Sequence, residues 1–210
     1  MLFADHETRM IARQQIIAHH LVWTAYGWWL PNDPRGSMSS FIQSDLIAEL
    51  GEIHYGRKRI QPAGWEIRQF YEDAPTRLQH ELLLFDKHAI QLVAESFATT
   101  IHRNGWTVYA CAIMPDHVHM LVRVHRDRAE KIIEKLQSDS RWYLREKGTR
   151  PKEHPVWGGP GWVVFQHSPD DIERTIRYIT SNPIKQRLPE QSWPFVTPYD
   201  GWPRKDYTRL

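Results

Sequence analysis

The sequence has a single cysteine, no long apolar run and almost no net charge. Cys111 alone cannot form an internal disulfide, which fits a protein of a reducing cytoplasm. Charges interrupt the first 15 residues, and no segment reaches the roughly 20 apolar residues of a membrane-spanning helix. We therefore expect neither a signal peptide nor a membrane partner. The formal net charge of +2 is too small to indicate nucleic acid, so a polyanion would need a local cluster of positive charge.

The rest of the composition favours a folded, globular protein. A chain of 210 residues is long enough for one domain with a sizeable insertion, and 41% hydrophobic and 25% charged residues are typical of such domains. Ten tryptophans and 14 prolines are unusually many. Tryptophan fills cores, but it also stacks on unpaired bases, so its abundance is compatible with both structural and binding roles.

The first third of the chain gives the weakest structural signals. Residues 16–28, IIAHHLVWTAYGW, are rich in branched and aromatic side chains and predict a strand. LPNDPRGS follows and must turn the chain. We interpret residues 30–84 as an insertion, with the basic cluster GRKR at 56–59 and a helix near 72–84, in a single domain that spans residues 1–210.

From Asp86 onward the hydrophobic periodicity is clear. Apolar residues recur first at the spacing of a helix and then in short strand-like runs. Ser168 can cap the last helix, and Pro169 suits its first turn. A Trp/Pro-rich tail at about 189–210, which includes WPFVTPYDGWP, is expected to pack on the core. The predicted helices are 86–105, 127–147 and 168–182, and the predicted strands are 106–114, 117–124 and 162–166.

The order of these elements predicts the fold class. It reads strand, insertion, helix, strand, strand, helix, strand, helix. The two strands joined by Pro115-Asp116 must pair as an antiparallel hairpin. The expected fold is α+β, a ferredoxin-like split βαβ sandwich with an antiparallel sheet and an added C-terminal helix. Such a fold does not by itself specify a chemistry.

Two histidines stand in the segment MPDHVHMLVRV, 114–124. Alternate residues of a strand share a face, so His117 and His119 point the same way, about 7 Å apart at the backbone. Neighbouring imidazoles repel when protonated, and a divalent cation between them turns that repulsion into attraction. For an isolated pair, two solvated surface histidines are the more common outcome. His19 and His20 are adjacent, face opposite sides of a strand, and do not form such a pair.

The closing helix carries polar side chains that could complete a site. Its isoleucines form an apolar stripe, and Tyr178 lies roughly 130° from the middle of this stripe at 100° per residue. Asn182 follows Tyr178 by four residues and Asp171 precedes it by seven, so the three share one face. Alone, such a tyrosine would be an ordinary surface residue. Beside the histidine pair it becomes a candidate reactive group.

Positive charge is concentrated in one segment. Residues 121–152 contain ten Lys/Arg against five Asp/Glu, a local excess of five. Arg141 and Arg145 are one helical turn apart near Trp142, and could hold a phosphate backbone while the ring stacks on a base. For each of these residues a solvated helix face is an equally good explanation. A second candidate group for DNA binding is Arg57, Lys58 and Arg59.

The two motifs together resemble a known enzyme family. PDHVHML, followed some 60 residues later by RYITSNP, is similar to the HUH single-tyrosine transposases, in particular the REP-associated tyrosine transposases and insertion-sequence transposases of bacteria. Their histidine motif is His-hydrophobic-His, usually after Met-Pro-Asn or Met-Pro-Asp. Their nucleophile lies in a helix that reads roughly Arg-Tyr-Ile-x-x-Asn-Pro. The likeness covers about residues 16–28 and 86–190.

The resemblance implies a role for each residue of these motifs. Tyr178 would attack a phosphate of single-stranded DNA, leaving a 5′-phosphotyrosine link and a free 3′-hydroxyl. His117, His119 and Asn182 would hold Mg²⁺ or Mn²⁺. The DNA would carry a hairpin beside the cleavage site, and the enzyme would act in the bacterial cytoplasm, at the nucleoid. Some relatives are homodimers whose tyrosine helix serves the partner's site, and others use it within one chain.

Several alternatives stay open at this point. Asn182 precedes Pro183, which disfavours helical geometry, and an amide is a weaker ligand than a carboxylate, so Asp171 or water is an alternative third ligand. A histidine-triad nucleotide hydrolase or transferase would need a third histidine where Leu121 stands. An inactive nucleic-acid-binding module of the same fold is the third hypothesis, and the intact histidines and tyrosine argue weakly against it.

Overall fold

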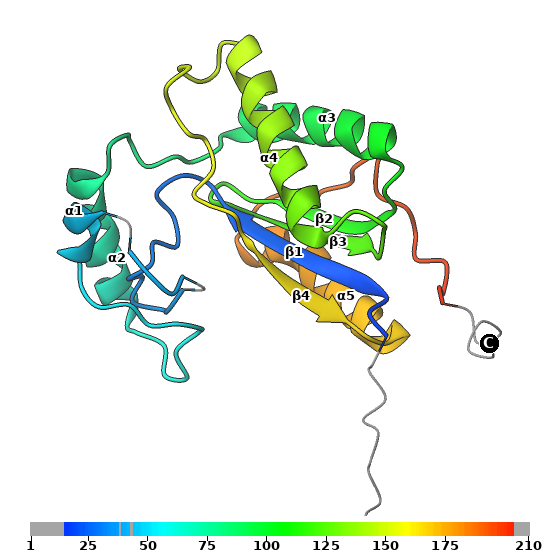
Figure 1. Ribbon diagram of the computed structural model, residues 1–210, viewed down its shortest axis with the longest axis horizontal. Coiled ribbons are helices and arrows are strands. Elements are labelled where there is room, and N and C mark those ends of the chain that lie inside the picture. The colour runs from blue at the N-terminus through cyan, green and yellow to red at the C-terminus, as the bar shows by residue number, and fades with distance from the viewer. Residues whose placement is uncertain (1–14, 38, 43, 204–210) are drawn as a thin grey trace, which may run out of the picture.

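A four-stranded antiparallel sheet forms the centre of the protein, seen in a computed structural model (Figure 1). The residues that the structure describes are 15–37, 39–42 and 44–203. The strands are β1 (Ala18–Thr24), β2 (Val108–Ile113), β3 (His117–Arg123) and β4 (Trp162–Gln166). They lie in the order β2-β3-β1-β4, and each neighbouring pair is antiparallel.

Three long helices cover the two faces of this sheet. Helices α3 (Lys87–Asn104) and α4 (Ala129–Glu146) lie on one face, and α5 (Pro169–Lys185) lies on the other (Figure 1). The larger core lies under α3 and α4, where the rings of Trp23 and Phe97 are 5.7 Å apart. This arrangement confirms the predicted α+β, ferredoxin-like sandwich with an added C-terminal helix. No helix among the described residues is long and apolar enough to cross a bilayer.

Local capping signals fix the ends of these helices. The Asp86 side chain accepts a hydrogen bond of 2.7 Å from the Ala89 N–H, and Gly105 ends α3 at a φ of +66°. Ser168 and Asp171 form a capping box at the start of α5, so the predicted cap is confirmed. Because these signals are local, the observed bounds of the three helices lie within three residues of the predicted ones.

The residues between β1 and α3 form a small unit beside one end of the sheet (Figure 1). Its apolar cluster consists of Leu30, Phe70 and Ala74, with further apolar side chains packed around them. The cluster is small, so this unit depends on polar contacts as well as on burial. Its elements are α1 (Asp45–Ala48), α2 (Gly64–Asp73) and the 3₁₀ helix η1 (Ala74–Arg77).

The prediction of a helix near 72–84 is wrong over most of its length. The helix lies earlier in the chain, and the segment between η1 and α3 has no regular secondary structure. There Leu83 and Phe85 are buried while Leu84 between them is 53% exposed, which is the alternation of a strand. The Leu83 N–H donates to the carbonyl of Tyr26 at 3.1 Å. This hydrogen bond joins residues far apart in the sequence, so the apolar residues around Leu83 do not predict it by themselves.

The C-terminal tail packs on the core along the outer edge of β2, as predicted for its described part. The Gln191 amide bonds to both backbone groups of Ile113, at 2.9 and 2.7 Å, and the Thr197 N–H donates to the carbonyl of Val108 at 2.7 Å. The tail therefore covers a strand edge that would otherwise be open to pairing. Residues 204–210 of the predicted tail lie outside the described residues.

The strand register brings the ends of three strands together. Thr24 lies opposite His117 in the β1–β3 pair, and Val22 lies opposite Trp162 in the β1–β4 pair. The end of β1 and the starts of β3 and β4 therefore meet at the same end of the sheet. The insertion leaves the sheet there, so it lies beside the histidine motif.

A glycine at this end of the sheet allows a close backbone approach. Gly161 has a φ of +75°, and a Cβ added to it would lie 2.5 Å from the carbonyl oxygen of Val22. Gly105 has a similar φ of +66° but no atom within 4 Å of an added Cβ. Gly105→Ala is expected to cost about 1–2 kcal/mol of unfolding free energy through its left-handed backbone alone.

Gly161→Ala is expected to cost about 1–3 kcal/mol more than Gly105→Ala, because the new methyl group overlaps the β1 backbone. Urea unfolding of both variants, followed by circular dichroism, measures the difference. Equal midpoints in the two variants would show that β1 does not constrain Gly161.

Candidate active site

The histidine pair lies on the sheet face that α5 covers. The rings of His117 and His119 have centres 4.8 Å apart and are nearly perpendicular, at 88°. Val118 and Met120, between and beyond them in β3, are fully buried in the core on the opposite face. The two histidines therefore share one face of β3, as the alternation of a strand predicts.

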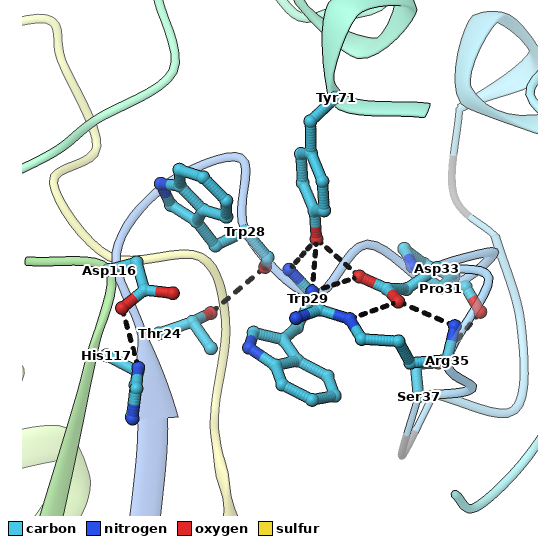
Figure 2. Close-up of polar contacts among 10 residues, drawn as sticks. All are labelled: Thr24, Trp28, Trp29, Pro31, Asp33, Arg35, Ser37, Tyr71, Asp116 and His117. Atoms are coloured by element: carbon cyan, nitrogen blue, oxygen red, sulfur yellow. Dashed lines mark hydrogen bonds and ion pairs between the residues drawn. The ribbon is translucent and has the colours of Figure 1, made fainter. Parts of the chain in front are cut away.

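Each of these imidazoles is held through its Nδ1 atom. His117 Nδ1 lies 2.7 Å from Oδ1 of Asp116, the residue before it (Figure 2). His119 Nδ1 lies 3.0 Å from Nε2 of His20, a residue of β1. When Nδ1 carries the proton in each contact, Nε2 of His117 and of His119 keeps a lone pair for a ligand.

His20 is a member of this site that sequence reasoning missed. His19 and His20 face opposite sides of β1 and do not pair with each other, as predicted. The register nevertheless places His20 opposite Leu121, on the same face as His119. The signal that could have found it is the pairing of β1 with β3, and this pairing joins residues about a hundred positions apart.

Burial keeps the inner imidazoles uncharged at neutral pH. It lowers the pKa of His20 to about 4. Burial also places the pKa of His119 well below its ordinary value, and the nearby His117 and His20 lower it further. Although burial opposes it, the hydrogen bond from His117 lowers the pKa of Asp116, so this carboxylate is ionised and accepts the Nδ1 proton. Uncharged imidazoles are the form that binds metal ions.

Helix α5 brings Tyr178 to the histidines. Its ring centre lies 5.3 Å from that of His119 and 6.0 Å from that of His20. The side chain is 45% exposed, so a ligand can reach it from solvent. The ammonium group of Lys185 lies 5.5 Å from the centre of the tyrosine ring and adds positive charge beside it.

Asn182 lines the same cavity as the histidines and Tyr178. Helix α5 continues through Pro183 to Lys185, so the expected break at Pro183 does not occur. Pro183 is near the helix end, where the Gln186 N–H still bonds to the carbonyl of Asn182. The buried Nδ2 of Asn182 has no hydrogen-bond partner among the described residues. This donor could bond to an acceptor atom of a ligand, whereas a cation would need the amide oxygen.

Asp171, the alternative third ligand, is used differently. Its carboxylate accepts the backbone N–H groups of His167 and Ser168 and pairs with Arg174, and it does not line the cavity. In the part of the chain that the structure describes, no three His, Cys, Asp or Glu side chains form a group that could hold a metal ion. The residues that fit a divalent cation are therefore the two imidazoles and the amide of Asn182, the latter through its oxygen.

The insertion forms one wall of this cavity, which has a volume of about 550 Å³. The glycine-rich turn 158–161 and the start of β4 form another wall. Of the predicted basic cluster, Arg57 lines the cavity, whereas Lys58 and Arg59 do not. The other lining residues from this side include Trp29, Arg35 and Ser37.

The structure does not bring the basic group on α4 to this cavity. Helix α4 lies across the sheet from α5, and the Arg145 guanidinium donates to the carbonyl of His154 at 3.0 Å. Arg141 is partly buried, and Trp142 is 62% exposed. DNA contact by Arg141, Trp142 and Arg145 stays a prediction, and it would involve a surface away from the histidines.

Comparison with protein families identifies the chain. A family model described as "Transposase IS200 like" matches residues 77–182, half of the sequence. The chain belongs to the IS200-like transposase family. It is accordingly a DNA transposase, an enzyme that cuts DNA and transfers strands. The match includes the histidine pair, Tyr178 and Asn182, and begins after most of the insertion.

Two solved structures are similar to this transposase in chain path. One is a REP-associated tyrosine transposase bound to a REP hairpin, 12% identical with a TM-score of 0.44, covering 87% of this chain and 79% of its own. The other, assigned as a transposase, comes from Deinococcus radiodurans R1; it is 11% identical with a TM-score of 0.36, and covers 90% of this chain and 98% of its own. These scores are too low to carry an argument. No curated protein matches the sequence.

Proposed function

We propose that this transposase cuts and rejoins single-stranded DNA through a 5′-phosphotyrosine intermediate on Tyr178. The observation that supports this most is the position of the tyrosine ring, 5.3 Å from His119 in one cavity with His117 and Asn182. A nucleophile beside a group of metal-ligating side chains is the arrangement that phosphoryl transfer by a weak nucleophile requires.

In the first step the Tyr178 hydroxyl attacks the scissile phosphorus. The new bond joins the phenolic oxygen to phosphorus, and the bond from phosphorus to the 3′ oxygen breaks. The phenolic proton leaves to solvent, and the departing 3′ oxygen takes up a proton from solvent to become a hydroxyl. In the second step the 3′-hydroxyl of another strand attacks the phosphotyrosine and releases the phenol. Each step exchanges one phosphodiester for another, so rejoining needs no ATP.

The histidines and Asn182 would bind Mg²⁺ or Mn²⁺ in this reaction. Bound there, the cation would withdraw electrons from the scissile phosphate. Asp116 holds the His117 ring through Nδ1, and His20 holds the His119 ring in the same way. The Nε2 atom of each ring therefore points away from the atom that holds the ring. Lys185 adds positive charge beside the tyrosine, which favours the developing phenolate.

We propose a hairpin-bearing DNA as the substrate and use of the tyrosine within one chain. The resemblance of the motifs PDHVHML and RYITSNP supports the hairpin. The position of Tyr178 beside the histidines of its own chain supports action in cis. A homodimer that exchanges α5 would place the partner's tyrosine in this position instead.

The test is the isolation of the covalent adduct. The full-length protein is incubated with Mn²⁺ and end-labelled single-stranded DNA from the regions flanking its gene, chosen to contain hairpins, and is then denatured. A labelled protein band is expected. Trypsin cuts after Arg177 and Lys185, so the nucleotide should be found on the peptide 178–185, which has one tyrosine.

Attachment to a histidine would instead indicate a histidine-nucleophile transferase. Hairpin binding with no adduct on any gene-flanking strand would indicate an inactive binding module. Either outcome contradicts the proposal.

A further inference from the structure

Two consecutive tryptophans at the start of the insertion have different roles (Figure 2). The Trp28 indole donates to the carbonyl of Leu83 at 2.7 Å, and its ring lies 4.6 Å from that of Tyr71. It therefore ties the start of the insertion to its end. Trp29 has no such contact through its indole nitrogen within the described residues, and its ring lines the cavity of the active site.

The backbone of Trp29 is held in an unfavourable conformation. Its φ is +52°, in the left-handed region that a bulky residue rarely adopts. The Trp29 N–H donates to the hydroxyl of Tyr71 at 2.9 Å, which holds the turn in place. Strain of this kind persists where surrounding contacts fix it, and it is common at ligand sites. Here it turns a large aromatic ring toward the cavity.

Arg35 lies over this ring and is itself fixed. Its guanidinium is 3.9 Å from the centre of the Trp29 ring. Its Nε and Nη2 atoms bond to the two oxygens of Asp33 at 2.8 and 2.7 Å, and Nη2 also donates to the Tyr71 hydroxyl at 3.1 Å (Figure 2). The Asp33 side chain is fully buried. Such a bidentate pair fixes the plane of the guanidinium.

Because Arg35 is paired with Asp33, the cavity wall that the insertion forms suits the stacking of a base better than the binding of a phosphate. The charge of Arg35 is balanced by Asp33, so the net charge available to a phosphate is small. The two N–H groups of Nη1 make no hydrogen bond within the described residues, and they remain available to a planar acceptor. The Trp162 ring lies next to that of Trp29, with the ring centres 6.3 Å apart and the planes tilted by 59°.

We propose that Trp29, Arg35 and Trp162 form a subsite for one unpaired nucleobase, next to the phosphate that Tyr178 attacks. The inference rests on the proposed function, which places single-stranded DNA in this cavity. Trp29 and Trp162 supply the stacking surfaces, which every base can use because every base has a π face. Arg35 covers one face of the Trp29 ring and fixes its plane, so the base would stack on the other face. The volume of about 550 Å³ lies within the range of sites that enclose small ligands.

The test compares two single strands with the same number of phosphates. One probe is a labelled 12-nucleotide oligothymidylate, and the other is a 12-unit strand of abasic sites. Binding is measured by fluorescence anisotropy with full-length protein that carries Tyr178→Phe, so that no cleavage occurs. Trp29→Gly removes the ring and suits the positive φ, so the turn should survive.

Trp29→Gly is expected to weaken oligothymidylate binding at least about fivefold, since one base stack is worth roughly that much or more. Binding of the abasic strand should not change. Trp29→Phe should recover most of the loss because it keeps a ring. The control is Trp65→Ala, which removes a tryptophan of the same insertion that is 59% exposed and does not line the cavity.

Equal weakening for both strands, or none for either, would overturn the subsite. Photo-cross-linking with 5-iodouracil in place of thymine gives a second measurement. The expected cross-link is on Trp29 or Trp162. Cross-links that are found only at other residues contradict the proposal. These outcomes can be told apart from those of the proposed function. If the adduct forms but Trp29→Gly does not weaken oligothymidylate binding, only the subsite is refuted. If Trp29→Gly weakens this binding but no adduct forms, only the phosphotyrosine intermediate is refuted.

Discussion

Tyr178→Phe is expected to abolish the covalent adduct and to lower DNA cleavage at least about a thousandfold. The substitution removes only the hydroxyl that forms the bond to phosphorus, and loss of a covalent nucleophile has an effect of this order or larger. The Tyr178 ring is 45% exposed, and no hydrogen bond of its hydroxyl is found among the described residues. The measurement is the yield of labelled adduct and of cleaved strand with time.

Two controls separate loss of chemistry from loss of structure. The free energy of unfolding of Tyr178→Phe should stay within about 0.5 kcal/mol of that of the wild type, because the site is at the surface. Tyr55→Phe removes a hydroxyl from another exposed tyrosine, 64% exposed in the insertion, and should retain full activity. Residual adduct in Tyr178→Phe would mean that another residue is the nucleophile.

The second half of the fold was predictable because its signals are local. Apolar spacing and the Asp86, Gly105 and Ser168 caps act within a few residues, and they predict the three long helices and the β2–β3 hairpin correctly. The Ser168 cap also explains why Asp171 is unavailable as a ligand. The Asp171 carboxylate completes the capping box. The helical spacing places Asp171 on the face of Tyr178, but it does not show that the carboxylate is already used by the cap.

The insertion was not predictable in the same way because it is held by distant contacts. The carbonyl of Gly56 would be 2.0 Å from a Cβ added to Gly36, so the glycine at position 36 allows two loops of the insertion to meet. Leu83 bonds to Tyr26, and Tyr71 holds the turn at Trp29. None of these pairs has a local periodic signal. The basic cluster at 56–59 was noticed for its charge, yet only Arg57 lines the cavity.

The position of the insertion nevertheless follows from topology. Once β1 is known to pair with β3, the end of β1 must lie at the start of β3, where the histidine motif begins. Any chain inserted after β1 then leaves the sheet beside the active site. The same register puts His20 next to His119. A single long-range pairing thus accounts for both features that the local analysis missed.

His117→Ala and His119→Ala are each expected to lose nearly all adduct formation, because each removes one of the imidazoles proposed to hold the cation. His20→Ala should have a smaller effect. It leaves both ligands but frees the ring of His119, and loss of such a supporting contact typically weakens metal binding about 10- to 100-fold. Excess Mn²⁺ should therefore restore adduct formation in His20→Ala, but not in the other two variants.

His19→Ala is the matched control for this series. His19 is adjacent to His20 in β1 but faces the other side of the sheet, where its ring packs against Phe165. Adduct yield across a Mn²⁺ titration measures the chemistry, and Mn²⁺ binding by electron paramagnetic resonance without DNA measures the metal affinity.

His19→Ala is expected to match the wild type in both adduct yield and Mn²⁺ affinity, with folding checked by thermal unfolding. If His19→Ala lost as much Mn²⁺ affinity as His119→Ala, the effect would come from β1 as a whole. The assignment of the cation to one face of the sheet would then be wrong.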